Sequence, residues 1–191
     1  MRRGILGGTF DPPHIAHLVA AEAAYRELEL DVVTFIPAGA PWQKADRHVS
    51  GPDHRWNMTR LAIEGVPYFE ADDREVLRPG WSYTADTLGT FPGEEELVVV
   101  LGADAALGLP TWNRWERVTE RATIAVMPRP GVDRQRVDEA VGRPLHWLDA
   151  PELAVSGAML RERLSRGGSV RFLVADRVRS YVSEQGLYGP A

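Results

Sequence analysis

The sequence predicts a doubly wound α/β fold built on a parallel sheet, and two observations lead to this prediction. Segments typical of strands alternate with segments typical of helices along the whole chain. The expected strands are continuous apolar runs, as in strands that are covered on both faces of a parallel sheet. With 191 residues, of which 44% are hydrophobic, the chain can bury a single core. We therefore expect one domain over residues 1–191, with C-terminal helices at about 156–186 packed on it.

The individual elements follow from local composition. Strands are expected where short apolar or β-branched runs end at glycine, proline or polar residues, at 3–6, 31–37, 68–71, 96–101, 123–127 and 145–148. Helices are expected where helix-favouring residues gather, at 15–28, 53–65, 83–88, 115–121, 132–141, 156–165 and 176–185. Residues 38–52 contain glycine, proline, lysine and histidine, which predicts a mobile loop.

Ligands of such folds bind beyond the carboxyl ends of the strands, where the strand order reverses. The residues that follow Leu6, Pro37, Leu101 and Met127 are therefore the first candidates for a binding site.

The composition restricts the class of partner. The chain has 22 basic and 27 acidic residues and a net charge of -5, which argues against a nucleic-acid partner. It has no cysteine, so disulfides and thiolate metal sites are excluded. We find no apolar run long enough to span a membrane, and the N-terminal residues lack the pattern of a signal peptide. These features predict a cytoplasmic protein without a membrane partner, and they leave a homo-oligomer open.

The segment after the first expected strand carries most of the functional information. It reads Gly7-Gly8-Thr9-Phe10-Asp11-Pro12-Pro13-His14-Ile15-Ala16-His17. The two glycines allow the backbone to approach a ligand closely, and the prolines favour a helix start. His14 and His17 then share one face of the first helical turn, whose backbone N–H groups and dipole attract anions. This arrangement predicts a phosphate site with two imidazole donors.

Two other roles for this histidine pair are less favoured. Two histidines at this spacing occur in zinc sites, but the remaining histidines lie in unrelated settings and supply no third ligand. A purely structural role would not explain why both histidines follow a strand, two glycines and two prolines. We therefore expect no protein-bound metal at this position.

At this point the sequence resembles a known family. The segment from Gly7 to His17 resembles the His-x-Gly-His motif of the nucleotidyltransferase superfamily, and the chain as a whole resembles bacterial nicotinate-nucleotide adenylyltransferases. Further segments that carry the resemblance are residues 37–44, 81–88, 102–104, 109–115, 129–131 and 156–161. The resemblance implies a Rossmann-like nucleotidyltransferase fold. It also implies adenylyl transfer from ATP to nicotinate mononucleotide, which gives deamido-NAD and pyrophosphate in NAD biosynthesis.

The resemblance also implies roles for particular residues. The catalytic set is expected to hold the ATP phosphates and comprises His14, His17, Lys44 and Arg161. Lys44 would act from the loop after the second strand, and Arg161 from the start of a late helix. Because no carboxylate cage is evident, Mg²⁺ is expected to arrive with ATP and its waters.

A second set is expected to bind the substrates. In the family, the segments matching Tyr83-Thr84 and the backbone near Trp112 hold the pyridine ring and its carboxylate, so acidic side chains should stay away. Asp104 is expected to bind a sugar hydroxyl or to cap a helix, and Asp11 to brace its loop. The remaining expected binding residues are Gly7, Gly8, Thr9, Phe10, Gly102, Arg129 and Ser156. Three other tryptophans, Trp56, Trp81 and Trp147, are expected to serve packing.

The sequence departs from the family pattern at two places. Ala16 stands where the motif has glycine, and Gly157-Ala158 stand where the pattern has serine and threonine. The loss of two hydroxyls predicts weakened ATP binding, which Gly157→Ser with Ala158→Thr would restore.

The sequence leaves two kinds of alternative function open. The acceptor could instead be nicotinamide mononucleotide or phosphopantetheine, or the chain could be a non-catalytic nucleotide-binding relative. A dinucleotide-dependent dehydrogenase is rejected, because no Gly-x-Gly-x-x-Gly follows the first strand.

Overall fold

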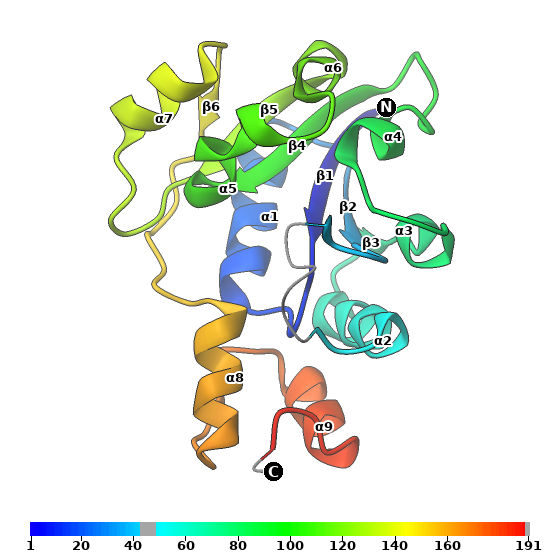
Figure 1. Ribbon diagram of the computed structural model, residues 1–191, viewed down its shortest axis with the longest axis vertical. Coiled ribbons are helices and arrows are strands. Elements are labelled where there is room, and N and C mark those ends of the chain that lie inside the picture. Colours follow the sequence, from blue (N-terminus) through cyan, green and yellow to red (C-terminus); the bar gives the residue numbers. More distant parts are fainter. Residues whose placement is uncertain (43–48, 190–191) are drawn as a thin grey trace.

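A computed structural model describes residues 1–42 and 49–189 of the chain, and it confirms the doubly wound α/β fold (Figure 1). The described residues form a six-stranded parallel sheet with the order β3-β2-β1-β4-β5-β6. The strands are β1 (Arg2–Gly8), β2 (Val32–Pro37), β3 (Phe69–Ala71), β4 (Glu96–Gly102), β5 (Ala122–Met127) and β6 (His146–Trp147). The chain winds outward from β1 in both directions, so the strand order reverses between β1 and β4.

The helices connect and cover these strands. They are α1 (Ile15–Glu27), α2 (Pro52–Ile63), α3 (Arg74–Leu77), α4 (Thr84–Leu88), α5 (Ala103–Leu107), the 3₁₀ turn η2 (Leu109–Thr111), α6 (Trp115–Arg121), α7 (Arg134–Val141), α8 (Gly157–Ser165) and α9 (Asp176–Glu184). Each strand and helix expected from the sequence is present within two residues at either end. Three short elements were not expected, namely α3, α5 and η2, because three to five residues hold too little periodicity to read.

Two expectations need correction. The first strand was expected to end at Leu6, but Gly7 and Gly8 continue β1 and pair with Ile36 and Pro37 at the end of β2. Glycine lacks a side chain but keeps its backbone hydrogen-bonding groups, so the neighbouring strand extends the pairing. Trp81 was expected to pack in the interior, but it is 49% exposed, just before α4.

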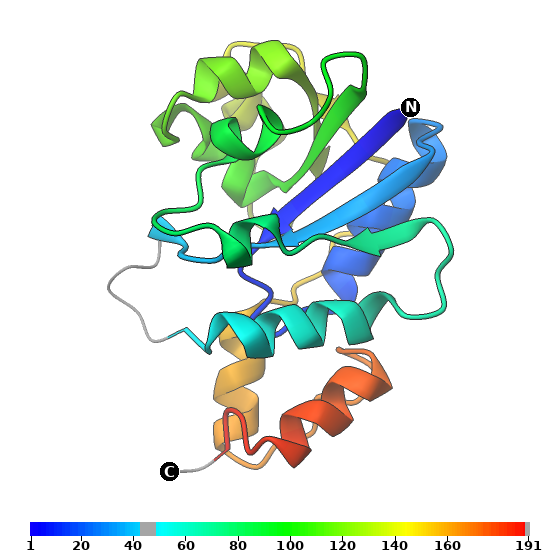
Figure 2. The ribbon, with the colours of Figure 1, turned by 90° about the vertical axis from the view of Figure 1, so that its right-hand side faces the viewer.

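The sheet separates two hydrophobic clusters, one on each face. Val98 and Val100 of β4 point into the cluster that includes side chains of α1, α2, α8 and α9. Val99 and Leu101 point into the other cluster, which is covered by α4 to α7. Figure 2 shows helices on both sides of the sheet. The alternation along an uninterrupted apolar strand is the pattern expected when both faces are buried.

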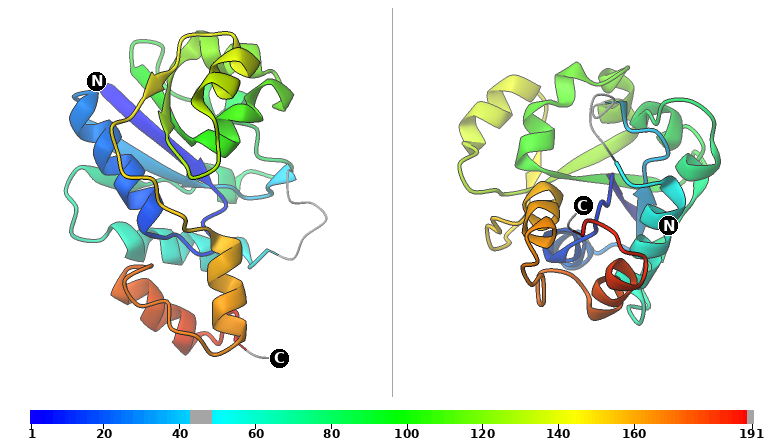
Figure 3. Two further views of the ribbon diagram at one scale, coloured as in Figure 1. Left: turned by 90° about the vertical axis from the view of Figure 1, so that its left-hand side faces the viewer. Right: turned by 60° about the horizontal axis from the view of Figure 1, so that its bottom comes forward.

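The C-terminal helices share the first of these clusters. Leu160 of α8 and Val178 of α9 are fully buried beside alanines of α1. Figure 3 shows α8 and α9 at one end of the molecule, beyond the carboxyl ends of the strands. The backbone N–H of Ile15, at the start of α1, donates to the carbonyl of Leu173 at 2.9 Å. The end of the chain is thereby attached beside the loop that follows β1.

Within the described residues, no helix has both the length and the apolar character needed to cross a membrane.

Candidate active site

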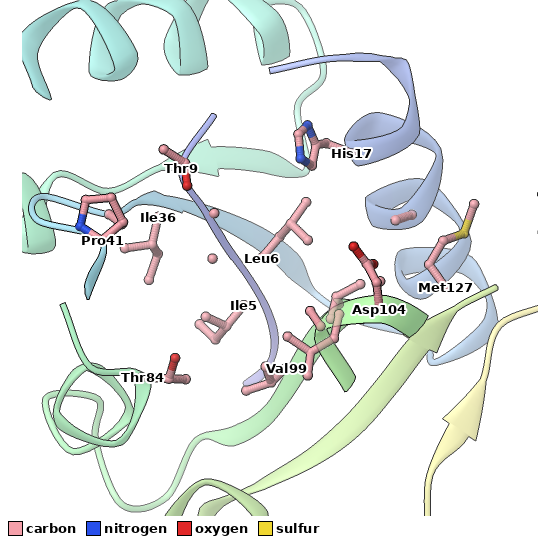
Figure 4. Close-up of a pocket in the computed structure, with 18 of the residues that line it drawn as sticks. Ile5, Leu6, Thr9, His17, Ile36, Pro41, Thr84, Val99, Asp104 and Met127 are labelled. Carbon is pink, nitrogen blue, oxygen red and sulfur yellow. The ribbon is translucent and has the colours of Figure 1, made fainter. Parts of the chain in front are cut away.

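A pocket of about 450 Å³ opens at the carboxyl ends of the central strands (Figure 4). Its lining includes Gly7 near the end of β1, Ala38 after β2, Gly102 at the end of β4 and Pro128 after β5. These are the four positions that the fold class alone predicted. In Figure 4 the side chains of Thr9, His17, Thr84 and Asp104 surround the same hollow, and each comes from a different segment.

Most of the expected site residues meet in this pocket. Those that line it are Gly7, Gly8, Thr9, His14, His17, Thr84, Gly102, Asp104, Trp112 and Arg129. Four others, Phe10, Tyr83, Ser156 and Arg161, are not among its lining residues. Lys44 lies outside the residues that the structure describes.

The two histidines form a stacked pair at the start of α1. Their ring centroids are 3.8 Å apart with an interplanar angle of 24°. His14 is the N-cap residue and His17 the third residue of the helix, so the spacing read from the sequence places both rings on one face. His14 is 4% exposed, while both residues line the pocket.

The tautomer of His17 follows from its hydrogen bond. Its Nδ1 accepts the backbone N–H of His14 at 3.1 Å. A ring nitrogen that accepts carries no proton, so the neutral ring carries its proton on Nε2. That N–H lies at the positive end of the α1 dipole. The helix start thus combines an imidazole donor with a favourable potential for an anion.

The opposite wall carries a carboxylate and a guanidinium. Asp104 lies in the first turn of α5, and its Oδ1 is 3.6 Å from Nη1 of Arg129. Arg129 also donates from Nη2 to the carbonyl of Val155 at 3.1 Å. A Cβ at Gly102 would lie 2.7 Å from Oδ1 of Asp104 and 3.2 Å from Cδ of Arg129. Glycine at this position therefore allows both side chains to approach the end of β4. The N-cap of α5 is Gly102 rather than Asp104, so the alternative capping role is wrong.

Phe10 is a packing residue of the loop after β1. It is 1% exposed, and its ring contacts the rings of His17 and Phe35 at centroid distances of 4.9 and 5.9 Å. Its backbone has a φ of 50°, in the left-handed region. Burial of the ring holds this conformation, and the ring in turn supports His17 from behind.

Ser156 and Arg161 serve the start of α8. The hydroxyl of Ser156 caps the helix by accepting the backbone N–H of Met159 at 3.3 Å. Arg161 donates from Nη1 to the backbone carbonyl of Asp11 at 2.7 Å and lies 3.8 Å from its Oδ2. Ser156 thus caps α8, and Arg161 links α8 to the loop after β1.

The geometry around Gly157 corrects the expectation about lost hydroxyls. A Cβ at Gly157 would lie 2.9 Å from the backbone oxygen of Asp11 and 3.3 Å from Nη1 of Arg161. Ala158 is exposed and does not line the pocket. Gly157→Ser would therefore disturb the contact between α8 and the loop, and Ala158→Thr would place its hydroxyl away from the pocket.

Glu75 lines the pocket, although the sequence reasoning did not identify it. Acidic side chains were expected to stay away from the pyridine ring and its carboxylate. Glu75 is 8% exposed, and its Oε1 accepts the hydroxyl of Thr87 at 2.5 Å. Nη2 of Arg78 is 3.7 Å from the same oxygen. Burial raises the pKa of Glu75, against the opposing effect of hydrogen bonds from Thr87 and Ser82 and of the charges of Arg78 and Arg74.

Arg55 is a second missed residue, and it connects the loops beneath the pocket. It is 1% exposed although it belongs to α2. Its guanidinium donates to the backbone carbonyls of Thr9 at 3.1 Å, Gly39 at 2.8 Å and Ser50 at 2.9 Å, and also to that of Ala38. The loops after β1 and β2 are thereby held to one cation. A lone arginine in a helix is usually solvated, so the sequence offered no signal for this role.

The remaining missed lining residues include Trp42, Ser82, Thr87 and Leu153. The rings of Trp42 and Tyr83 lie 6.2 Å apart, measured between centroids, so Tyr83 lies beside a lining residue although it does not line the pocket itself. The signal for Trp42 and Ser82 was present in the family segments 37–44 and 81–88. Leu153 lies in a segment without periodicity and had no comparable signal.

Among residues 1–42 and 49–189, no group of three or more histidine, aspartate or glutamate side chains is arranged to hold a metal ion. The carboxylates that line the pocket are those of Asp104 and Glu75, and both have partners within the protein. This donor set suits a metal that enters with phosphate ligands better than a resident metal.

The close approach of Gly157 leads to a testable prediction. Gly157→Ala should lower kcat of the expected adenylyl transfer about tenfold, because the added methyl displaces the loop that carries His14, and small misplacements are costly in catalysis. Steady-state kinetics measure the effect. The exposed neighbour provides the matched control, since Ala158→Ser should change kcat less than twofold. Equal kcat values for Gly157→Ala and the wild type would contradict the proposed contact.

Glu75 leads to a prediction about pH. Because its pKa is raised in the folded state, its contribution to stability is fully present below the unfolded-state pKa of about 4.3 and is lost as the pH rises through the folded-state pKa. Glu75→Gln is neutral at every pH, so its stability relative to the wild type should increase as the pH rises from about 4. Urea unfolding at several pH values measures this difference. Glu94→Gln, at an exposed position, is the control. A difference that shrinks with rising pH would refute the assignment.

Comparisons with known proteins agree with this geometry. The sequence profile of the family described as cytidylyltransferase-like matches residues 5–163. A Dehalococcoides mccartyi protein described as "Probable nicotinate-nucleotide adenylyltransferase" is 41% identical, over 98% of this chain and 97% of its own length. A Thermoanaerobacter sp. protein of the same description is 38% identical, over 98% of this chain and 94% of its own length.

A solved structure matches the fold. The nicotinic acid mononucleotide adenylyltransferase of Plasmodium falciparum, complexed with NaAD, superimposes with a TM-score of 0.83 and 17% identity, over 98% of this chain and 97% of that chain. At this identity the superposition concerns the fold alone. Together with the near full-length sequence matches, the fold and the pocket at its switch point place this chain in the nicotinate-nucleotide adenylyltransferase family of the cytidylyltransferase-like proteins.

Proposed function

We propose that this chain transfers the adenylyl group of ATP to the phosphate of nicotinate mononucleotide. A phosphate oxygen of the mononucleotide attacks the α-phosphorus of ATP. The bond between that phosphorus and the oxygen that bridges to the β-phosphate breaks, and pyrophosphate leaves with the bonding electrons. The products are deamido-NAD and pyrophosphate. The near full-length matches to nicotinate-nucleotide adenylyltransferases support this assignment.

One observation carries the proposal for the site. Two stacked imidazoles stand at the N-terminus of α1, inside a pocket at the point where the strand order reverses. Transfer between phosphates is accelerated by hydrogen-bond donors that stabilise the negative charge developing on the phosphate oxygens in the transition state. The two imidazoles are already oriented for this task. A transfer between two phosphates needs no protein nucleophile, and no cysteine is present in the chain.

The histidines would act on the ATP phosphates. The neutral ring of His17 carries its proton on Nε2, since its Nδ1 accepts the backbone N–H of His14. The stacked ring of His14 restricts the orientation of His17, and Phe10 supports it from the other side. Donors that are already fixed in orientation lose little freedom when the transition state forms. They therefore stabilise the transition state more strongly than the bound substrates.

The other end of the pocket would hold the pyridine nucleotide. Thr84 begins α4 and Trp112 closes η2, and both line the pocket. The backbone N–H groups of the α4 start favour a carboxylate, and the indole of Trp112 offers a face for the ring. Asp104 would accept a hydrogen bond from a sugar hydroxyl. Glu75 is compatible with a bound carboxylate because Thr87 already donates to it and burial favours its neutral form.

Lys44 and Arg161 have different places in this scheme. We keep Lys44 as a phosphate-binding residue of the loop after β2. Arg161 contacts Asp11 rather than the pocket, so we assign it to holding the loop. Mg²⁺, when it arrives with ATP, neutralises charge on the phosphate oxygens.

The choice of acceptor is tested by direct competition. Nicotinate mononucleotide should give a kcat/KM at least about tenfold above that of nicotinamide mononucleotide, because only the acid offers a charge to the start of α4. A coupled assay of pyrophosphate release measures both, with phosphopantetheine as a third acceptor. An equal rate with the amide, or a higher rate with phosphopantetheine, would assign the enzyme to another acceptor.

The role of the histidines is tested by substitution. His17→Ala should lower kcat by about 10²-fold or more, as for the loss of one preorganised donor, with a smaller effect on ATP binding. The matched control is His146→Ala, since His146 lies beside Glu27 at 3.7 Å and outside the pocket. Its kcat should stay within twofold of the wild type. If His17→Ala instead weakened ATP binding as much as it lowered kcat, the histidine would serve binding and not the transition state.

A further inference from the structure

Tyr188, in the segment after α9, reaches the loop that carries the two pocket histidines. The hydroxyl of Tyr188 donates to Oδ1 of Asp11, a residue 177 positions earlier in the sequence. Asp11 belongs to the loop between β1 and α1, and its side chain is 3% exposed. The same loop presents Thr9 and His14 to the pocket. A residue beyond α9 therefore contacts the segment on which the proposed chemistry depends.

Asp11 is held from several directions, and Tyr188 supplies one of these contacts. Its Oδ2 accepts the backbone N–H of Ser50 at 3.3 Å, and Nη1 of Arg161 is 3.8 Å away. The charge of Arg55 also acts on this carboxylate. Among the described residues, Oδ1 has the Tyr188 hydroxyl as its hydrogen-bond donor.

Tyr188 is itself fixed in place. Its backbone φ of 60° lies in the left-handed region, after a turn in which Leu187 N–H donates to the carbonyl of Val182 at 3.0 Å. Its hydroxyl also lies 3.9 Å from Sδ of Met58, a fully buried residue of α2. Burial and the neighbouring Asp11 raise the pKa of Tyr188, so the phenol keeps its proton and remains a donor.

The link from Asp11 to His14 is short and stiff. Only Pro12 and Pro13 separate the two residues, and each proline ring fixes one backbone dihedral. A displacement of Asp11 is therefore transmitted to His14 instead of being absorbed between them. Because His14 donates its backbone N–H to Nδ1 of His17, the displacement also reaches the second histidine.

From these contacts we infer that Tyr188 is a positioning residue for adenylyl transfer, which acts through the carboxylate of Asp11 to fix the loop that presents His14 and His17. The inference rests on the proposed function for its kinetic readout. Tyr188 is not among the residues that line the pocket, so we place it outside the substrate sites. Its effect should therefore appear in kcat, with little change in KM for the pyridine nucleotide.

Tyr188→Phe tests this role, and Tyr181→Phe is a matched control. Tyr181, on α9, bonds Nδ1 of His54 at 2.9 Å and accepts from Asn57 at 3.2 Å, so its hydroxyl contacts α2 and not the loop. Each substitution removes one hydroxyl from the same end of the chain. Tyr188→Phe should lower kcat about tenfold with KM for nicotinate mononucleotide within twofold, because misplaced donors lose transition-state stabilisation. Tyr181→Phe should leave kcat within twofold, whatever either variant does to the melting temperature.

A spectroscopic readout separates positioning from activity. In ¹⁵N-resolved NMR of the imidazoles, Tyr188→Phe should shift the signals of His14 and His17, and Tyr181→Phe should shift that of His54. Asp11→Asn, which keeps the tyrosine ring and its packing, should reproduce the loss in kcat. Combined with Tyr188→Phe it should add little further loss, as for two residues of one contact. Asp11→Asn also keeps the inference testable if Tyr188→Phe does not fold.

Several results would overturn the inference. An unchanged kcat in Tyr188→Phe, an equal loss in Tyr181→Phe, or additive losses in the double variant would reduce Tyr188 to a stabilising contact. If the wild type were inactive with nicotinate mononucleotide, the proposed function would fail. The imidazole signals would then still decide the positioning role, because they are measured without turnover.

Discussion

The pocket exists because one buried cation holds two loops in place. The guanidinium of Arg55 lies beneath the loops after β1 and β2 and donates to the carbonyls of Thr9, Ala38, Gly39 and Ser50. These carbonyls belong to loop backbone, and buried carbonyls of this kind need donors. Arginine suits the task because its planar group carries five N–H donors and keeps its charge.

Burying that charge is costly, and the surroundings show how the cost is reduced. Burial lowers the pKa of Arg55, and the carboxylate of Asp11 opposes this effect. Asp11 in turn receives the hydroxyl of Tyr188 and lies beside Arg161. The result is a connected network in which each buried polar group has a partner, and such networks favour one arrangement of the backbone. Arg55 of α2 and Tyr188 of the C-terminal segment therefore fix the loop that presents the histidines.

An acidic protein binds anions here because positive potential is gathered locally. The net charge is -5, yet the start of α1, the histidine pair and Arg129 all face one pocket. Two carboxylates line the pocket, and the effect of their negative charge is reduced. Arg129 lies beside Asp104, Thr87 donates to Glu75, and burial favours the neutral form of Glu75. Charges more than about 8–10 Å away are largely screened by salt, so the electrostatic potential in the pocket depends more on the groups that line it than on the net charge of the protein. Glycine at 157 has a steric role, because close contact between α8 and Asp11 takes the space that a side chain would fill.

The sequence by itself determined the fold class, the elements and the chemical kind of the site. The apolar runs of β4 and β5 and the spacing of His14 and His17 are local patterns, so their consequences can be read along the chain. The tertiary structure alone decided the roles of Arg55, Glu75 and Tyr188, and the contact of Arg161 with Asp11 instead of the pocket. Each of these depends on a partner 12 to 177 residues away, and neither composition nor periodicity records which distant group a side chain will meet when the sheet closes.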